Sequence, residues 1–128
     1  MRKRIIALLP GDGIGPEVVG EARRVVEAVG ERCGFGVEWV SFPFGAGYWK
    51  SHGEALPDSA LGELEKCEAL LLGAVGDPSV KPGILERGIL LRLRFHFDQY
   101  INLRPARSYP GVALPVRLPE GRRIDSVV

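Results

Sequence analysis

Two arginines, Arg94 and Arg104, stand ten residues apart in the most basic part of the chain. From residue 81 to residue 107, six basic residues stand against two acidic ones, which gives this segment a net charge of +4 and leaves −3 for the rest. A guanidinium group binds a carboxylate through two parallel hydrogen bonds. A local positive charge on a nearly neutral chain therefore predicts a small anionic ligand, with a solvated basic face as the alternative.

The loop of residues 10–15 is a second candidate for chemistry, because its glycines follow an apolar run and precede a helical pattern. A dinucleotide-binding fingerprint needs a third glycine where Pro16 stands, and an acidic residue at the end of the next strand. The strand predicted over 37–42 ends without one. We therefore interpret the loop as a tight strand-to-helix turn that Asp12 orders through side-chain hydrogen bonds. The N–H groups at the start of the following helix still favour a ligand at this edge.

The elements that position these residues follow from the spacing of apolar side chains. Apolar runs predict strands over residues 5–9, 37–42, 69–72, 100–103 and 125–128. Helical spacing predicts helices from residue 16 to the glycines at 30 and 34, over 59–66 with Asp58 as the cap, and over 86–97. Residues 45–57 are expected to form a turn-rich connection. Strands that alternate with helices predict a layered α/β fold, with a largely parallel sheet and flanking helices and without Rossmann character.

Length, composition and cysteine content exclude several classes of protein. A chain of 128 residues with 45% hydrophobic and 26% charged residues is typical of a globular domain. A net charge of +1 argues against a nucleic-acid binder, and no apolar run is long enough to span a bilayer. Cys33 and Cys67 are expected to be reduced thiols in or near the core, which favours a cytoplasmic protein. The chain ends on an apolar strand pattern, which we interpret as truncation within a core strand.

Three motifs, in order along the chain, carry a resemblance to a known family. Residues 9–18 (LPGDGIGPEV) resemble the N-terminal signature of the isocitrate/isopropylmalate dehydrogenases, which are β-decarboxylating dehydrogenases. Residues 71–78 (LLGAVGDP) resemble their intervening strand and loop, and residues 85–94 (LERGILLRLR) with 102–106 (NLRPA) resemble their substrate-binding segment. The resemblance runs in register along essentially the whole chain. It therefore identifies residues 1–128 as the N-terminal part of the family's first α/β domain.

The resemblance implies a substrate-binding role for four residues. Arg94 and Arg104 match two arginines that bind the carboxylates of a 2-hydroxy dicarboxylic acid. Leu90 and Leu91 match positions that contact the variable substituent of this substrate. Apolar side chains there favour the isopropyl group of isopropylmalate over a carboxylate-bearing substituent, by roughly 1–3 kcal/mol per contact. The alternative is that both leucines are ordinary core residues.

Cofactor binding is implied for only two residues of this chain. Glu86 matches the acidic residue that the family places near the nicotinamide ring of NAD, with Arg87 competing for the position. Ile14, in the first loop, is expected to pack against the nicotinamide end of the cofactor. Arg92 falls on another side of the helix from Arg94 and is expected to be exposed to solvent. The family's Mg²⁺ or Mn²⁺ ligands and its lysine and tyrosine acid/base groups all follow residue 128 in family order. We therefore assign no metal ligand and no catalytic residue within these residues.

The resemblance thus implies NAD-dependent oxidative decarboxylation of 3-isopropylmalate in leucine biosynthesis, by an enzyme whose full-length relatives form homodimers. Dehydrogenases of the tartrate/malate, homoisocitrate or isocitrate type are the alternatives within the family. The alternative of another class is a non-catalytic truncated or split-gene product that binds an anionic ligand or a partner chain. The fragment alone is expected to be inactive.

Overall fold

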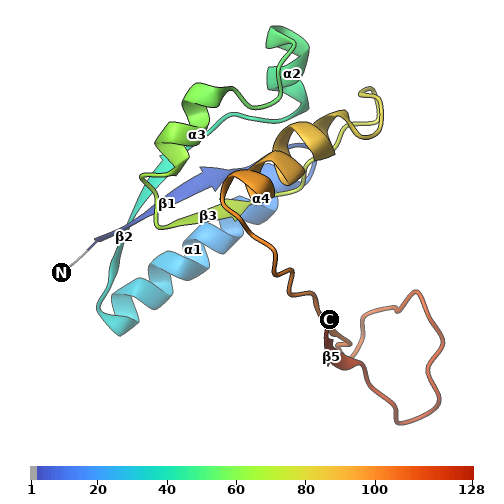
Figure 1. Ribbon diagram of the computed structural model, residues 1–128. Coiled ribbons are helices and arrows are strands. Elements are labelled where there is room, and N and C mark those ends of the chain that lie inside the picture. The colour runs from blue at the N-terminus through green and yellow to red at the C-terminus, as the bar shows by residue number, and fades with distance from the viewer. Residues whose placement is uncertain (1–2) are drawn as a thin grey trace. The chain divides into compact units, whose positions relative to one another are not determined.

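The chain forms two compact units in the computed structural model, which describes residues 3–128. The first unit runs to Phe97 and contains a three-stranded parallel sheet with helices on both sides (Figure 1). The strands of this sheet are β1 (Lys3–Leu9), β2 (Gly36–Ser41) and β3 (Ala69–Leu72), in the order β2-β1-β3. The predicted α/β fold with a parallel sheet is thus confirmed.

The central strand β1 forms because its apolar run can be buried on both faces. It pairs with β2 through residues 3–8 and with β3 through residues 6–9, so both of its edges are hydrogen-bonded. Ala7, Leu8 and Leu9 are all buried. A continuous apolar run of this kind is typical of a strand inside a parallel sheet.

Helix α1 (Gly15–Cys33) lies on one side of the sheet and begins and ends close to the predicted residues (Figure 1). A proline in the first turn fits there, because the first N–H groups of a helix have no partner within it. Gly34 ends the helix in the left-handed conformation, with φ of 77°, and donates its N–H to the carbonyl of Gly30 at 2.8 Å. Gly30 itself stays helical, and a Cβ there would stand 2.7 Å from the carbonyl oxygen of Phe35.

Two helices on the other side of the sheet differ from the predictions (Figure 1). Helix α2 (Ala46–His52) occupies part of the segment expected to be a turn-rich connection. Helix α3 (Asp58–Leu64) was predicted, but Asp58 is its first residue and makes no capping hydrogen bond; Pro57 precedes it instead. The predicted capping role of Asp58 is therefore wrong.

The last helical run of the first unit has two parts, a π-helical turn η1 (Glu86–Leu91) and helix α4 (Arg92–His96). Its apolar side chains complete the main core, together with side chains from β1, α3 and the segments around α2. This core comprises Ala7, Leu9, Phe42, Phe44, Ala46, Ala55, Leu56, Ala60, Leu61, Leu64, Val80, Leu85, Ile89 and Leu93. The first unit is therefore built mainly around one core, to which η1 and α4 are anchored.

The second unit, Asp98–Val128, is an antiparallel pair of short strands, β4 (Pro105–Arg107) and β5 (Asp125–Val127). None of its residues is buried. The strand predicted over 100–103 is not found, and pairing begins only after it. The predicted final strand is found as β5, and its residues are exposed in this chain.

Both cysteines are free thiols, as expected, but Cys33 is exposed and Cys67 is half-buried. The expectation that Cys33 lies in or near the core is wrong. Burial raises the pKa of the Cys67 thiol, with a smaller contribution from the nearby Glu63 carboxylate. None of the helices within residues 3–128 combines the length and apolar character that a membrane span requires.

Candidate functional site

The loops that follow β1, β2 and β3 meet at the C-terminal edge of the sheet and are joined by Asp12. The backbone N–H of Asp12 donates to the carbonyl of Ala74 at 2.6 Å, which joins the loops after β1 and β3. Its carboxylate accepts the N–H of Ala46 at 2.8 Å and that of Gly76 at 3.1 Å. The prediction of ordering hydrogen bonds from Asp12 is confirmed, although its side-chain partners lie in the other two loops and not in its own turn.

Glycines allow the first and third of these loops to touch through their backbones. Gly11 has φ of 75°, and a Cβ there would stand 2.1 Å from the carbonyl oxygen of Ala74. A Cβ on Gly73 would stand 2.0 Å from the carbonyl oxygen of Pro10. No side chain fits at either position, so these glycines are required for the close approach of the two loops.

A second polar contact attaches the loop after β3 to helix α2. Asp77 accepts the backbone N–H of Ser79 at 2.8 Å and pairs with the ammonium group of Lys50 at 2.9 Å. The hydroxyl of Ser79, followed by Lys50, lowers the pKa of Asp77 to about 2. This carboxylate is therefore ionised at neutral pH, and its contacts with Ser79 and Lys50 hold the loop against α2.

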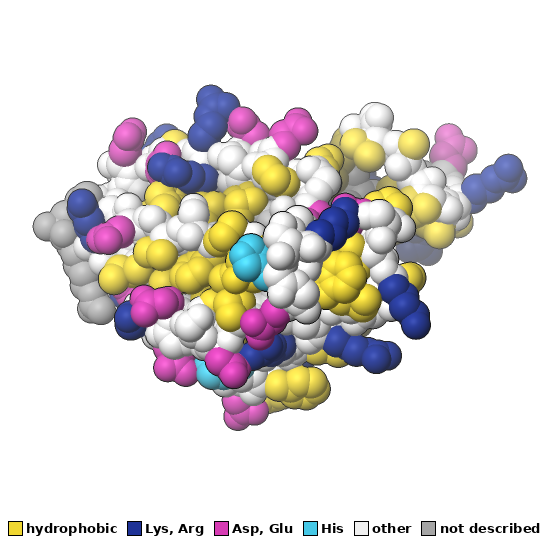
Figure 2. Space-filling model, turned by 90° about the horizontal axis from the view of Figure 1, so that it is seen from above, with side chains coloured by type: hydrophobic (Ala, Val, Ile, Leu, Met, Phe, Trp, Pro, Cys, Tyr) yellow, Lys and Arg dark blue, Asp and Glu magenta, His cyan; other side chains and the backbone are white. Residues whose placement is uncertain are grey.

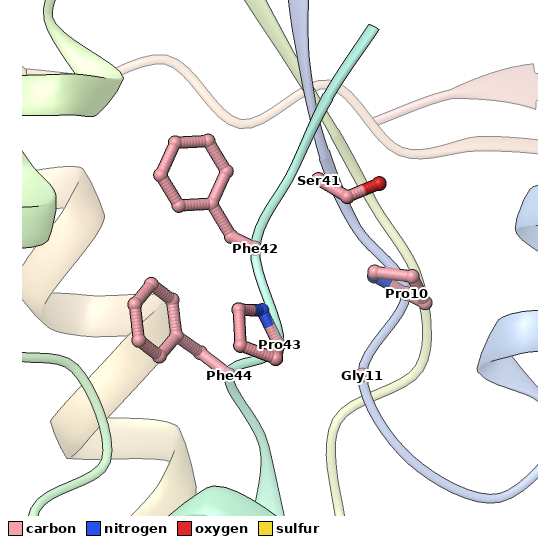
Figure 3. Close-up of a pocket in the computed structure, with 6 residues that line it drawn as sticks. All are labelled: Pro10, Gly11, Ser41, Phe42, Pro43 and Phe44. Atoms are coloured by element: carbon pink, nitrogen blue, oxygen red, sulfur yellow. The ribbon is translucent and has the colours of Figure 1, made fainter.

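A pocket of about 460 Å³ opens between the ends of β1 and β2. It is lined by Pro10, Gly11, Ser41, Phe42, Pro43 and Phe44, and in Figure 3 the rings of Phe42 and Phe44 point to the same side of their segment. The lining is largely apolar, and none of the residues predicted to bind substrate or cofactor is part of it. The pocket therefore adds no support to those predictions.

Four of the predicted site residues lie on one helical run. Glu86 begins η1, is exposed, and accepts the backbone N–H of Gly83 at 2.8 Å. Leu90 is half-buried, Leu91 is 43% exposed, and Arg94 is half-buried in α4. Residues three and four apart are neighbours on a helix surface, so Leu90 and Leu91 both lie one turn from Arg94. Neither leucine belongs to the main core, which removes the alternative that both are ordinary core residues.

Arg92 differs from its prediction. Its guanidinium group is half-buried and pairs with Asp58, with the carboxylate of Glu54 at 3.7 Å. It therefore links α4 to the start of α3 and is not simply solvent-exposed. In the second unit Arg107 pairs with Asp125 at 3.1 Å. Part of the positive charge counted between residues 81 and 107 is thus neutralised by carboxylates outside that segment.

The two remaining predicted residues lie elsewhere. Ile14 is in the loop after β1, directly before α1, and its side chain is 63% exposed. Arg104 belongs to the second unit, where its backbone N–H donates to the carbonyl of Val128 at 2.7 Å. Arg104 directly precedes β4. The strand that the sequence predicts over 100–103, which Arg104 would have followed, is not found.

Charged side chains of both signs are intermixed on the face shown in Figure 2, with hydrophobic side chains visible between them. Within residues 3–128, no three His, Cys, Asp or Glu side chains gather closely enough to hold a metal ion. A divalent cation therefore does not fit the described residues by themselves.

The parallel sheet with its flanking helices is shared with solved structures of β-decarboxylating dehydrogenases. Residues 5–128 match the isocitrate/isopropylmalate dehydrogenase family, and the chain belongs to it. It is 56% identical over 124 residues to the 3-isopropylmalate dehydrogenase of Saccharopolyspora erythraea. It is 51% identical over 123 residues to the 3-isopropylmalate dehydrogenase of Thermobifida fusca.

These alignments cover 96% of this chain but only 34% and 35% of the two enzymes, respectively. The chain thus spans about a third of the length of the curated relatives it matches. Among solved structures, it is similar to isocitrate dehydrogenase from Methylococcus capsulatus, with 29% identity and a TM-score of 0.73. That similarity covers 97% of this chain and 33% of the other.

Proposed function

We propose that this chain is the substrate-binding N-terminal part of a cytoplasmic, homodimeric 3-isopropylmalate dehydrogenase, an NAD-dependent enzyme of leucine biosynthesis. The observation that carries the proposal is the helical run 86–94. The buried side chains of this run pack in the main core. Arg94, Leu90 and Leu91 are half-buried or exposed on the rest of its surface. A cation one turn from two apolar side chains suits a substrate with a carboxylate next to an alkyl group.

In this proposal the arginines bind carboxylates and the leucines bind the isopropyl group. Arg94 and Arg104 each offer a planar guanidinium, which pairs with a carboxylate through two hydrogen bonds. Contact with Leu90 and Leu91 removes the isopropyl group from water, which is favourable for an apolar group. The chain binds and orients the substrate, and the proton-transfer groups come from outside these residues.

Ile14 and Glu86 are proposed to contact the nicotinamide end of NAD. Both side chains are accessible, so both fit such a contact. NAD bound there would supply the acceptor for the hydride on the substrate's hydroxyl-bearing carbon. The proposal includes Mg²⁺ or Mn²⁺ in the complete enzyme only, because the described residues offer no ligand cluster.

The two arginines can be tested in a chimera in which this chain replaces the matching N-terminal third of the Saccharopolyspora erythraea enzyme. We expect Arg94→Gln and Arg104→Gln each to lower kcat/KM for 3-isopropylmalate by roughly 10- to 100-fold. A hydrogen bond to a charged group contributes about 1.5–3 kcal/mol, and a factor of ten corresponds to about 1.4 kcal/mol.

Arg24→Gln is the matched control, because Arg24 is an exposed arginine on α1 that pairs only with Glu21 among the contacts described. It should leave kcat/KM within about twofold of the parent. Steady-state NADH formation measures all three variants. Parent-like kcat/KM in Arg94→Gln or Arg104→Gln would remove that arginine from the proposed site.

A further inference from the structure

The helical run that carries Glu86, Leu90 and Arg94 departs from α-helical geometry in its first part. Glu86–Leu91 form the π-helical turn η1, and α4 continues directly from it. In a π-helix the backbone hydrogen bonds join residues i and i+5, whereas in an α-helix they join i and i+4. A π-helical turn therefore takes up one residue more than an α-helical turn. Such turns are rare and occur frequently at functional sites.

The extra residue changes which side chains of the run can face the core. Leu85, Ile89 and Leu93 follow one another at intervals of four, and they are 2%, 0% and 4% exposed. In a uniform α-helix, residues eight apart point roughly 80° away from each other, because 3.6 residues make one turn. With one residue taken up by η1, an interval of eight corresponds to about two turns. All three side chains can then reach the same core.

A second set of residues, beside the buried set, follows the same spacing. Glu86, Leu90 and Arg94 each come directly after one of the three core residues and are also separated by intervals of four. The π-helical turn therefore aligns them along one side of the run, next to the buried side. A uniform α-helix of this sequence would turn Glu86 away from Arg94 by the same angle of roughly 80°.

Gly88 places the wide turn against the core. A Cβ on Gly88 would stand 2.7 Å from the Cβ of Ala55, which is 6% exposed and belongs to the main core. Gly88 is not in the left-handed region, so the need for glycine here is one of space. Any larger residue would push η1 away from the segment between α2 and α3.

We propose that η1 sets the register of the substrate site and that Gly88 is the positioning residue that seats this turn on Ala55. The proposal rests on the proposed function, because it concerns how Glu86, Leu90 and Arg94 are presented to a substrate. Gly88 touches no substrate itself. It acts through the wide turn, which keeps three residues in the core while it aligns three others outside it.

The test uses the 128-residue chain with Gly88→Ala, Ala55→Gly and the double variant, studied by nuclear magnetic resonance. One readout is the register itself: the i→i+5 backbone hydrogen bonds expected within Glu86–Leu91, and the side-chain contacts that this register is expected to give between Leu90, Glu86 and Arg94. The other is the shift of the Arg94 guanidinium signal on titration with 3-isopropylmalate. Gly20→Ala is the control, because Gly20 is an exposed helical glycine with nothing within 4 Å of an added Cβ.

We expect Gly88→Ala to lose the register contacts and to weaken 3-isopropylmalate binding at least fivefold. The double variant should regain the contacts and bind within twofold of the parent, and Gly20→Ala should change neither readout. Parent-like contacts in Gly88→Ala, or a double variant that does not regain them, would overturn the proposal. If Gly88→Ala does not fold, the double variant decides in the same way. A parent chain that binds no 3-isopropylmalate counts against the proposed function, and the register contacts still decide this inference.

Discussion

At the scale of single residues, three donors converge on the carboxylate of Asp77: the hydroxyl and N–H of Ser79 and the ammonium of Lys50. They favour the ionised form, which is why the pKa of Asp77 falls to about 2 although the group is accessible to water. The pair with Lys50 is partly exposed, so the contribution of this ion pair to stability is small and decreases with salt.

The lowered pKa of Asp77 has a defined dependence on pH. Because the folded pKa lies below the ordinary value of 3.8, the stabilisation is complete above about pH 4 and is lost as the pH falls toward about 2. We expect the ¹³C signal of the Asp77 carboxyl to titrate near pH 2. Ser79→Ala should raise this midpoint more than Lys50→Met, since the hydroxyl is the largest cause. A midpoint near 3.8 in the unmodified chain would refute this description of the contact.

At the scale of elements, helix α2 depends on a residue far away in the sequence. Its first N–H groups receive no capping side chain from Gly45, the residue that precedes it. The carboxylate of Asp12 accepts the N–H of Ala46 in its place, across 34 residues of chain. Asp12 is therefore a remote N-terminal cap, which satisfies a donor that the helix cannot satisfy itself.

We expect Asp12→Ala to loosen α2 and to destabilise the chain by about 1 kcal/mol, the usual cost of a lost cap. Asp12→Asn keeps one acceptor oxygen and should cost less. Hydrogen exchange at the N–H of Trp49, which donates to the carbonyl of Gly45, reports on α2 directly. Glu31→Ala, an exposed position on α1, is the control. Unchanged exchange at Trp49 in Asp12→Ala would show that α2 does not need this cap.

The same dependence explains which elements could be predicted from the sequence. Strands β1 and β3 and the end of α1 follow from local patterns, an apolar run or a glycine after helical spacing. Helix α2 does not follow from a local pattern, because its cap is remote. The π-helical form of η1 does not either, because apolar residues at intervals of four lie close to the 3.6 residues per turn of an ordinary α-helix. The segment 100–103 has the composition of a strand, yet β4 begins only at Pro105, where β5 supplies a partner.

The candidate site, too, could be predicted from the sequence only in part. Spacing alone places Leu90, Leu91 and Arg94 on one helical run, and the structure agrees. The ion pairs of Arg92 with Asp58 and of Lys50 with Asp77 join segments 34 and 27 residues apart, and no local pattern indicates them. The roles of Arg94, Arg104, Leu90, Leu91, Ile14 and Glu86 in binding stay predictions.

At the scale of the whole molecule, the two units differ in how they are stabilised. The first has a core of buried side chains, and the second has none. In the second unit, large hydrophobic side chains such as Tyr100, Ile101 and Leu103 are 66–83% exposed. The chain spans about a third of the length of the relatives that it matches, so the proposed reaction is expected to need residues beyond those of this chain.

We therefore expect the purified 128-residue chain to form no NADH from NAD and 3-isopropylmalate with Mg²⁺ present. The described residues hold no metal-binding cluster, and the proposed acid/base groups lie outside them. The assay needs a preparation free of host dehydrogenase, with the Saccharopolyspora erythraea enzyme as a positive control. Turnover that co-purifies with the chain and is lost in Arg94→Gln would contradict this expectation.

The central claim, that Leu90 and Leu91 contact the alkyl group of the substrate, is tested most directly by substrate preference. The measurement is the ratio of kcat/KM for 3-isopropylmalate to that for malate, in the chimera and in its Leu90→Ser and Leu91→Ser variants. We predict a preference for 3-isopropylmalate that falls by roughly tenfold or more in at least one variant, because an apolar contact discriminates by about 1–3 kcal/mol. Equal losses on both substrates, or a parent chimera that prefers malate, would contradict the claim.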